Sequence, residues 1–327
     1  MRGISNMENL SVLLTTYPEA FLHKGGGEYE LLETALNLRK LGFIADAYSP
    51  YSNSLDNYAN IIHFSINPSG LPLLQAVKAA GKRVVLWPNF WTTEPNHNSY
   101  PYISSFLNLS DLVVFKSNIE KINFEKIEPL DNIETIIVPT SVDKIFTDIT
   151  PPSLFRESFG IDKYLVWVGI IEPKKNQLTA IQALSSLDVP IVFIGNYRDK
   201  SYYEACKNAA SSKCLFLGPM EHKSDLLRAA IRESALYIEP SLEPAGKSIL
   251  EAAICGARLL VSDNPWEHEH LGKFAIYVNP TDQESLRQGV QQGLVTSPPV
   301  SQAKVISEKH LFPKAIAQLT AYLVSVQ

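Results

Sequence analysis

The chain has 327 residues, too many for one ordinary single-core domain and suitable for two domains that each bury a core. Its 45% hydrophobic and 19% charged residues are those of a globular protein, and the formal net charge of −5 gives no overall attraction for nucleic acid or anionic lipid. No apolar run approaches the roughly 20 residues that span a bilayer, and the amino terminus lacks a signal-peptide core. Three cysteines without metal-type spacing favour reduced thiols. We expect a cytoplasmic protein, with association at the inner face of a membrane left open.

Short apolar runs alternate with longer segments of helical period, which is the signature of βα units and a parallel sheet. In chain order, strands are expected at residues 10–16, 43–49, 61–66, 83–88, 111–117 and 135–142. A helix is expected at residues 28–41, with Leu32, Ala35 and Leu36 on its apolar face and Gly42 at its end. A second series of strands follows at residues 164–170, 189–195, 214–218, 235–241, 257–263 and 275–280. The α/β pattern therefore predicts two doubly wound domains.

The seam between the two series is expected at residues 146–160, where the periodicity lapses and Pro151 and Pro152 fit neither element. We therefore place an N-terminal domain at residues 1–150 and a second domain at residues 151–305. Residues 306–327 are expected to form a helical segment, broken near Pro313, that packs back toward the N-terminal domain.

Residues 240–256 read PSLEPAGKSILEAAICG and place a tight loop between a strand and a helix. Gly-Lys-Ser ends a P-loop, but the required earlier glycine is Ser241 here, so a P-loop is excluded. The loop follows the carboxyl end of a parallel strand, and the first amides of a helix starting at Ser248 would attract a phosphate. Glu243 and Glu251 frame this stretch. Their alternative roles are a solvated loop residue for Glu243 and a capping box with Ser248 for Glu251.

The stretch PSLEPAGKSILEAAICGARLLVSD resembles the E-x7-E motif of family 4 glycosyltransferases, which have the GT-B fold. Further segments resemble this family in the same order: KGGGEYELLETALNLRKLGF, LSDLVVFKSNIEKI, IIVPTSVDKIF, LVWVGIIEPKKNQLTAIQAL and YVNPTDQESLRQGV. Only the segment around the two glutamates is specific by itself. The resemblance implies GT-B architecture, with two Rossmann-like domains that face each other across a cleft.

The resemblance also implies a function. The protein would be a hexosyltransferase of polysaccharide biosynthesis that moves a sugar from a nucleotide-diphosphate sugar to a glycan, lipid-linked or other hydroxyl acceptor. Configuration would be retained, with no metal and no cofactor, and no Asp-x-Asp occurs in the chain. By the family's pattern, Glu251 would hold the nucleotide ribose and Glu243 would lie against the donor sugar. The amides of Gly246, Lys247 and Ser248 would meet the diphosphate and the sugar.

Positive charge is needed where the diphosphate leaves, because the transition state moves negative charge onto the leaving oxygen. Family members commonly carry an arginine at the position of Ile170 and a lysine at that of Lys175. Lys247 is the candidate substitute for the missing arginine, with Lys174 less favoured, although a lysine does not reproduce a bidentate donor. The alternative for these lysines is a solvated surface role.

In the first domain, Gly25, Gly26 and Gly27 precede a helix and would let the backbone approach an acceptor or a phosphate. A dinucleotide fingerprint is excluded, because its third glycine would fall at Glu30. Many relatives carry a histidine after the fourth strand; here Asn89 is nearest to that place and His97 is farther along. Trp91, like its neighbours Trp87 and Phe90, would either stack on an acceptor sugar or pack beneath a loop.

Two rival functions stay open. The absent arginine and histidine suit a non-catalytic GT-B relative that binds a sugar nucleotide or a glycan, and a GT-B epimerase or phosphorylase is the other alternative. His268 and Glu269 begin a metalloprotease-like H-E, but Gly272 replaces the second histidine, so no metal is expected. The expected partners are a nucleotide sugar and a hydroxyl acceptor, without nucleic acid.

Overall fold

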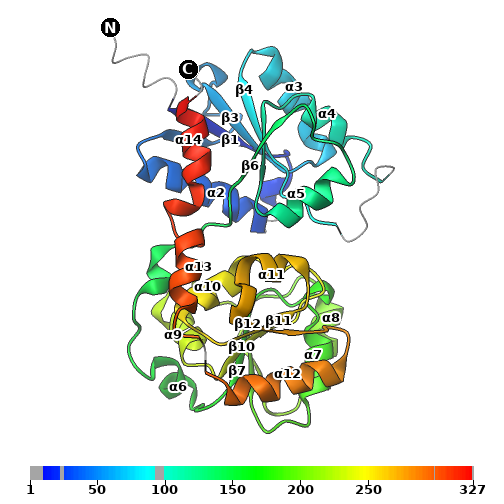
Figure 1. Cartoon of the computed structure of the whole chain (residues 1–327), viewed down its shortest axis with the longest axis vertical. Coiled ribbons are helices and arrows are strands. Elements are labelled where there is room, and N and C mark those ends of the chain that lie inside the picture. Colours follow the sequence, from blue (N-terminus) through cyan, green and yellow to red (C-terminus); the bar gives the residue numbers. More distant parts are fainter. Residues whose placement is uncertain (1–9, 23–25, 93–98, 298, 326–327) are drawn as a thin grey trace. The chain divides into compact units, whose positions relative to one another are not determined.

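The computed structural model describes residues 10–22, 26–92, 99–297 and 299–325. The chain forms two compact units, the first made of Met1–Pro139 and Pro313–Gln327 and the second of Thr140–Phe312 (Figure 1). The boundary between Pro139 and Thr140 precedes the seam expected at residues 146–160, because the intervening segment is bound to the second unit. Val142 N donates to His310 O, and the Arg228 guanidinium donates to the carbonyl of Ile145.

Six parallel strands form the sheet of the first unit, in the order β2-β1-β3-β4-β5-β6. They are β1 (Ser11–Thr15), β2 (Ile44–Ala47), β3 (Asn60–Phe64), β4 (Arg83–Trp87), β5 (Leu112–Phe115) and β6 (Glu134–Ile137). Each of the six strands overlaps one of the ranges expected from the apolar runs. A parallel sheet is covered on both faces, so its strands are apolar almost throughout, which is why these runs were visible.

The helices of the first unit cover both faces of this sheet (Figure 1). They are α2 (Gly26–Lys40), α3 (Leu71–Ala79), α4 (Ile103–Leu107), α5 (Asn118–Glu125) and α14 (Ala317–Ser325). The predicted apolar face of α2 is wrong in part. Leu31, Ala35 and Leu38 are buried, whereas Leu32 and Leu36 are exposed. Two apolar stripes overlap on this helix, and only the one at positions i, i+4 and i+7 faces the sheet.

The second unit repeats the architecture with the strand order β12-β11-β10-β7-β8-β9, again all parallel. Its strands are β7 (Leu165–Val168), β8 (Ile191–Ile194), β9 (Cys214–Phe216), β10 (Leu236–Glu239), β11 (Leu259–Ser262) and β12 (Ala275–Val278). Counted within the unit, this is the order 3-2-1-4-5-6 of the dinucleotide-binding Rossmann fold. The predicted pair of doubly wound sheets is therefore confirmed.

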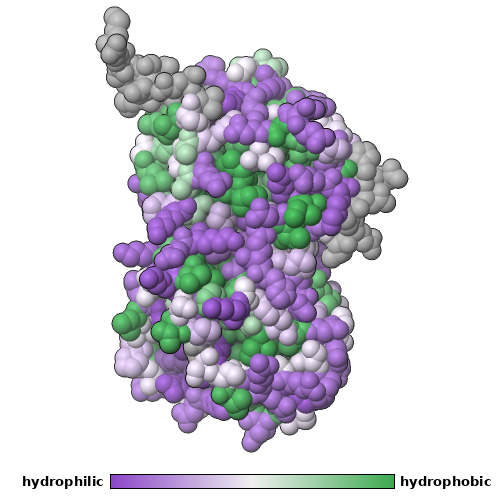
Figure 2. Space-filling model, viewed as in Figure 1, coloured by the Kyte–Doolittle hydropathy of each residue, from purple (hydrophilic) through white to green (hydrophobic). Residues whose placement is uncertain are grey.

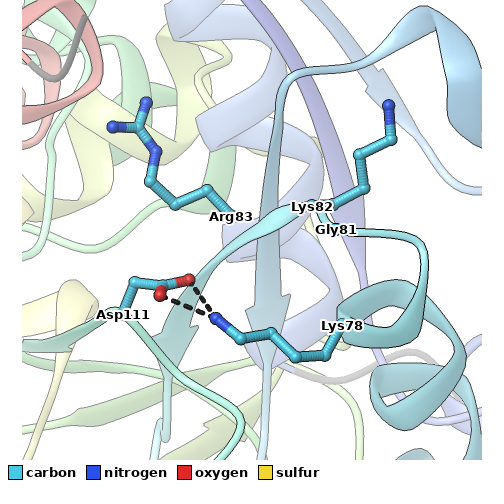
Figure 3. Close-up of a pocket in the computed structure, with 5 residues that line it drawn as sticks. All are labelled: Lys78, Gly81, Lys82, Arg83 and Asp111. Atoms are coloured by element: carbon cyan, nitrogen blue, oxygen red, sulfur yellow. Dashed lines mark hydrogen bonds and ion pairs between the residues drawn. The ribbon is translucent and has the colours of Figure 1, made fainter.

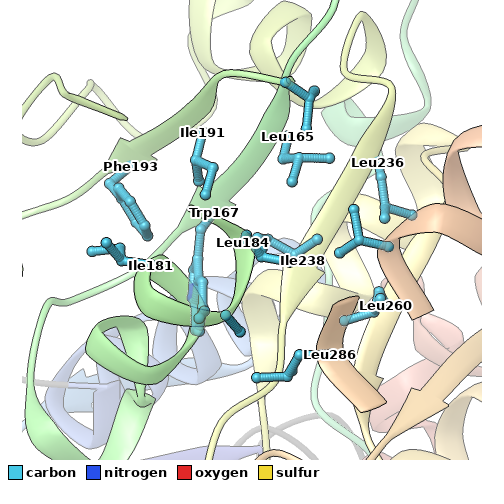
Figure 4. Packing of buried hydrophobic residues seen from close by; sticks show 14 of the residues in the cluster. Leu165, Trp167, Ile181, Leu184, Ile191, Phe193, Leu236, Ile238, Leu260 and Leu286 are labelled. Carbon is cyan, nitrogen blue, oxygen red and sulfur yellow. The ribbon is translucent and has the colours of Figure 1, made fainter. Parts of the chain in front are cut away.

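The described part of the second unit contains eight α-helices. They are α6 (Leu154–Phe159), α7 (Gln177–Leu184), α8 (Lys200–Ala209), α9 (Asp225–Arg232), α10 (Lys247–Cys255), α11 (Pro265–Leu271), α12 (Gln283–Val295) and α13 (Gln302–His310). Figure 4 shows the core beneath α7 and α12, where Trp167 and Phe193 pack among aliphatic side chains of the neighbouring strands. Burial of such large side chains stabilises the unit by about 2 kcal/mol each.

The strand order identifies where each sheet can bind a ligand. In the first sheet β1 lies beside β3, and in the second β7 lies beside β10, so the connections on either side of each pair run to opposite faces. In open α/β sheets this switch point leaves a crevice at the carboxyl ends of the strands. The segments that follow β1, β7 and β10 are therefore the places to look for function.

The surface gives no sign of a membrane span. Within the part of the chain that the structure describes, no helix combines the length and the apolar character that crossing a bilayer requires. The face seen in Figure 2 is largely hydrophilic, with hydrophobic residues in small scattered groups.

Candidate active site

The segment after β10 turns sharply into helix α10. Gly246 has φ 85° and ψ −141°, a conformation that a side chain would strain, and α10 begins at the next residue, Lys247. Gly256 ends the helix in the left-handed conformation, which glycine adopts without strain. The first backbone amides of a helix have no partners within it, and the helix dipole adds about half a positive charge at this end. The amino end of α10 therefore suits an anion.

The segment after β7 is joined to the segment after β10. Asn176 adopts φ 65°, and its side-chain amide donates to Pro240 O at 3.1 Å and to Pro280 O at 2.7 Å. Lys175 Nζ lies 3.8 Å from Glu243 Oε1, and Lys174 Nζ lies 4.0 Å from Glu243 Oε2. The structure thus brings together two residues singled out in the sequence, Lys175 and Glu243, at the switch point of the second sheet.

Glu239, the last residue of β10, was not singled out in the sequence, although an acid inside the apolar run LYIE was a signal. Its carboxylate is fully buried and lies 3.4 Å from Lys175 Nζ. Ser248 Oγ donates to Glu239 Oε2 at 2.8 Å. The alternative of a capping box between Ser248 and Glu251 is wrong, because the N-cap of α10 is Gly246. Burial raises the pKa of Glu239, and the Lys175 ammonium opposes that rise.

Glu267 on α11 is a second buried acid that the sequence reading missed. Its Oε1 accepts a hydrogen bond from Ala245 N at 2.9 Å, within the loop that carries Glu243. Burial raises the pKa of Glu267 to about 8, and the nearby Glu239 carboxylate adds to the rise. Its neighbour His268 is exposed, lies 2.7 Å from Asp263 and stacks on Tyr277, which is a surface role.

Glu251 lies in the second turn of α10 and is buried except for 5% of its surface. Its Oε1 is 2.9 Å from His222 Nε2, in the segment between β9 and α9. The ring of His222 also lies 5.6 Å from that of Phe146. His222 was missed because nothing in its own sequence surroundings indicates a partner 29 residues away.

In the first unit, part of the glycine-rich segment can be placed. Gly25 lies outside the described residues, and Gly26 and Gly27 begin α2 after β1. A Cβ atom at Gly27 would lie only 2.8 Å from Asn89 Nδ2, so a larger residue would displace the asparagine. Asn89 itself has φ 47°, and its side-chain oxygen accepts from Lys116 Nζ. Gly27 and Asn89 are therefore neighbours at the carboxyl edge of the first sheet.

Charged residues absent from the sequence prediction surround this position. Lys116 Nζ lies 3.5 Å from Glu30 Oε2. The buried Glu120 carboxylate accepts from Lys116 N at 2.6 Å and from Phe90 N at 3.3 Å. Burial raises the pKa of Glu120 to about 7, against the opposing effect of Lys116.

The aromatic residues at the end of β4 and just after it differ in how they pack. The ring of Trp87 stacks on Phe64, and Phe90 meets Tyr100 edge-on, so both pack within the unit. Trp91 is partly buried, and its indole N–H has no hydrogen-bond partner among the described residues. His97 lies outside the described residues.

A separate pocket of about 270 Å3 opens at the opposite, amino-terminal edge of the first sheet (Figure 3). The Lys78 ammonium in it lies 2.7 Å from both carboxylate oxygens of Asp111. The Arg83 guanidinium bonds the side chain of Asn60. Lys78 and Arg83 thus bind polar groups of the protein itself, and the pocket is remote from the carboxyl edge.

Comparison with known proteins identifies a family for part of the chain. Residues 154–307, which carry Lys175, Glu243 and Glu251, match the family model described as glycosyl transferases group 1. The chain carries a glycosyl transferases group 1 domain. The predicted resemblance to family 4 glycosyltransferases is thereby confirmed, and sugar transfer is the general activity that it supports. A search of curated proteins finds no match.

Solved structures show the same fold as this chain over nearly its whole length. A sucrose-phosphate synthase from Thermosynechococcus elongatus has a TM-score of 0.79 at 12% identity, over 97% of this chain and 100% of the other. Anabaena HepE, solved with UDP and glucose, has 0.77 at 17%, over 97% and 100%. A Rickettsia africae ESF-5 glycosyltransferase has 0.75 at 17%, over 97% and 99%. The GT-B fold is therefore confirmed.

Proposed function

We propose that this glycosyltransferase moves a hexose from a nucleoside diphosphate sugar to a hydroxyl acceptor, with retention of configuration and without a metal ion. The sugar's bond to the diphosphate oxygen breaks, and its bond to the acceptor oxygen forms on the same face. The acceptor hydroxyl releases its proton, and the nucleoside diphosphate leaves. A soluble glycan or a lipid-linked sugar, as used in polysaccharide biosynthesis, is the class of acceptor we propose.

One observation carries the proposal: the loop after β10 places Glu243 beside Lys175 at the switch point of a Rossmann-type sheet and then enters the amino end of α10. A diphosphate is bound by hydrogen-bond donors, such as backbone amides, and by positive charge. The first amides of α10, at Gly246, Lys247 and Ser248, supply the donors, and the helix dipole supplies part of the charge. This arrangement suits the charge that develops on the leaving oxygen.

The two glutamates take different roles in this proposal. Glu251, almost fully buried on α10, would accept hydrogen bonds from the ribose hydroxyls, in exchange with its present partner His222. Glu243, more exposed in the loop, would lie against the donor sugar. Lys247 and Lys175 would favour departure of the diphosphate, Lys175 from a position already shared with Glu243.

The acceptor would be bound by the first unit. The glycine-rich segment, of which Gly26 and Gly27 are described, lets a ligand approach the backbone after β1, at the switch point of that sheet. Asn89 and Trp91 follow β4 at the same edge. We assign Asn89 to hydroxyl contacts and Trp91 to stacking on a sugar face.

The test begins with a thermal-shift screen of the full chain with UDP, GDP, ADP and CDP, in which UDP is the first choice because HepE was solved with it. With the nucleotide that binds, Glu251→Ala should weaken affinity at least tenfold. Glu243→Ala should leave nucleotide affinity within about threefold but slow transfer at least a hundredfold. Wild-type behaviour of both variants would refute the assigned roles.

A non-catalytic relative that binds a sugar nucleotide is the second candidate, and Ile170 favours it. A bidentate arginine at that position would bind phosphate in a way that no lysine reproduces. Tight binding of a nucleoside diphosphate, with no turnover over a broad panel of nucleotide sugars and acceptors, would support this candidate. If wild type transfers a sugar and Glu243→Ala abolishes this transfer, the non-catalytic candidate is refuted.

A further inference from the structure

Two carboxyl groups, those of Glu239 and Glu267, lie fully buried around the loop that carries Glu243. They come from different elements, Glu239 from the end of β10 and Glu267 from α11. A buried carboxyl group costs free energy unless its hydrogen bonds and charge are satisfied, so two in one place require a reason. Neither belongs to the pair of glutamates to which the proposed function assigns the donor.

The hydrogen bonds of the two groups converge on one peptide segment. Ala245 N donates to Glu267 Oε1 at 2.9 Å, and Ala245 O accepts from Lys175 Nζ at 3.3 Å. Both polar groups of this residue, two positions after Glu243, are therefore held by side chains, the fully buried Glu267 and the partly buried Lys175. The next residue, Gly246, has a positive φ of 85°, which lies outside both the helical and the strand regions, so regular backbone hydrogen bonding cannot fix its conformation.

Glu239 binds Lys175, the side chain that donates to the Ala245 carbonyl. Its Oε1 lies 3.4 Å from Lys175 Nζ, and its Oε2 accepts from Ser248 Oγ at 2.8 Å, in the first turn of α10. Tyr237 OH also donates to Glu239 Oε2, at 3.2 Å. Glu239 thus anchors Lys175 on one side of the loop and the start of α10 on the other.

Glu267 has the chemistry of a neutral acid. Its Oε2 is buried and has no hydrogen-bond partner among the described residues, which an ionised oxygen could not sustain. Burial raises the pKa of the group to about 8. A protonated carboxyl keeps a carbonyl oxygen for the Ala245 amide without placing a second negative charge beside Glu239. Glutamine has the same shape and the same acceptor.

We infer that Glu267 and Glu239 are positioning residues that set the shape of the loop at residues 242–246, Glu267 through the Ala245 amide and Glu239 through Lys175 and Ser248, and so place Glu243. This inference rests on the proposed function for the role of Glu243, but the statement that the two acids set the shape of the loop does not depend on that function. The carboxyl oxygen of Glu267 is what the loop requires, and its charge is not.

The first measurement needs no ligand. Hydrogen–deuterium exchange of the full chain should show the Ala245 amide exchanging at least tenfold faster in Glu267→Ala than in wild type, and within threefold of wild type in Glu267→Gln. Glu267→Asp keeps the carboxyl group but is one methylene too short to reach the Ala245 amide, so this amide should also exchange fast while the circular dichroism of the variant stays native. Glu204→Ala, an exposed acid on α8, is the matched control. Wild-type exchange in Glu267→Asp, or fast exchange in Glu267→Gln, would overturn the inference.

The second measurement separates positioning from general damage. With the nucleotide sugar that the protein uses, Glu267→Asp should lower kcat at least tenfold and change the donor KM less than threefold, and Glu267→Gln should restore kcat. A rise in KM with unchanged kcat would overturn the assignment. If wild type binds no nucleoside diphosphate, the proposed function fails while the exchange result still decides whether Glu267 holds the loop.

Discussion

The buried Glu267 carboxyl should make the second unit less stable as the pH rises, and Glu267→Gln should remove that effect. Its pKa is about 8 in the folded protein against an ordinary 4.5, because burial disfavours the charged form. Between these values the folded protein keeps a proton that the unfolded chain has lost. Stability therefore falls as pH rises from about 4.5 to about 8 and is level above that.

The size of the effect follows from the same two values. At about 1.4 kcal/mol per pH unit, the full difference between 4.5 and 8 is on the order of 5 kcal/mol. Between pH 5.5 and pH 8, the glutamine variant should gain about 3 kcal/mol relative to wild type. The groups that face Glu267 are Glu239 on β10, Lys175 before α7 and Tyr277 on β12, and all are common to both proteins.

Urea unfolding followed by tryptophan fluorescence provides the assay, since Trp167 and Trp266 are both buried in the second unit. The free energy of unfolding would be measured at half-unit steps from pH 5.5 to pH 8.5 for wild type and Glu267→Gln. Glu204→Gln, on the surface, should run parallel to wild type. If the curves of wild type and Glu267→Gln were also parallel, Glu267 would be ionised in the folded state, and its description as a neutral acid would be refuted.

Three further changes test other contacts. Gly195→Ala would place a Cβ atom 1.9 Å from the Gly169 carbonyl oxygen and should cost more than about 3 kcal/mol in thermal unfolding; a loss below about 1 kcal/mol would contradict this contact. Lys175→Met should lower the free energy of unfolding by about 3 kcal/mol, because it removes the counter-charge of a fully buried carboxylate. Lys174→Met, at an exposed site, should lower it by under about 1 kcal/mol. Equal losses would show that the buried ion pair is unimportant. Burial lowers the pKa of His63 to about 4, so between pH 6.5 and 4 only the unfolded chain takes up the proton. The free energy of unfolding of wild type should therefore fall by up to about 3 kcal/mol over this range. An unchanged acid sensitivity in His63→Gln would exclude this residue as a cause.

Strand positions were readable from the sequence for a physical reason. Both sheets are parallel and covered on both faces, so most strands are apolar runs bounded by polar residues, and strands at the edges, such as β2 and β6, are less apolar. The helix after β10 was readable as well, because Gly246 and Gly256 mark its ends in conformations that glycine adopts without strain. The same stretch lies within residues 154–307, which match the glycosyl transferases group 1 model.

Helix faces were harder to read. On α2 the neighbouring pairs Leu31 and Leu32, and Ala35 and Leu36, give two overlapping apolar stripes of the same period. Periodicity alone cannot say which stripe packs, since both satisfy the helical repeat. The sheet decides, by covering Leu31 and Ala35 and leaving Leu32 and Leu36 outside.

The sequence by itself determined the two series of strands and helices, the glycine turns and the presence of Glu243, Lys175 and Glu251, because each of these depends on local pattern. Only the tertiary structure decided that Lys175 meets Glu239, 64 residues away, and that Glu267 binds the Ala245 amide. The order of the strands brings β7 beside β10, and a pairing between distant segments leaves no trace in the local pattern of either one. The protonation of Glu267 was equally out of reach, because it follows from burial and from the charges that the fold places around it.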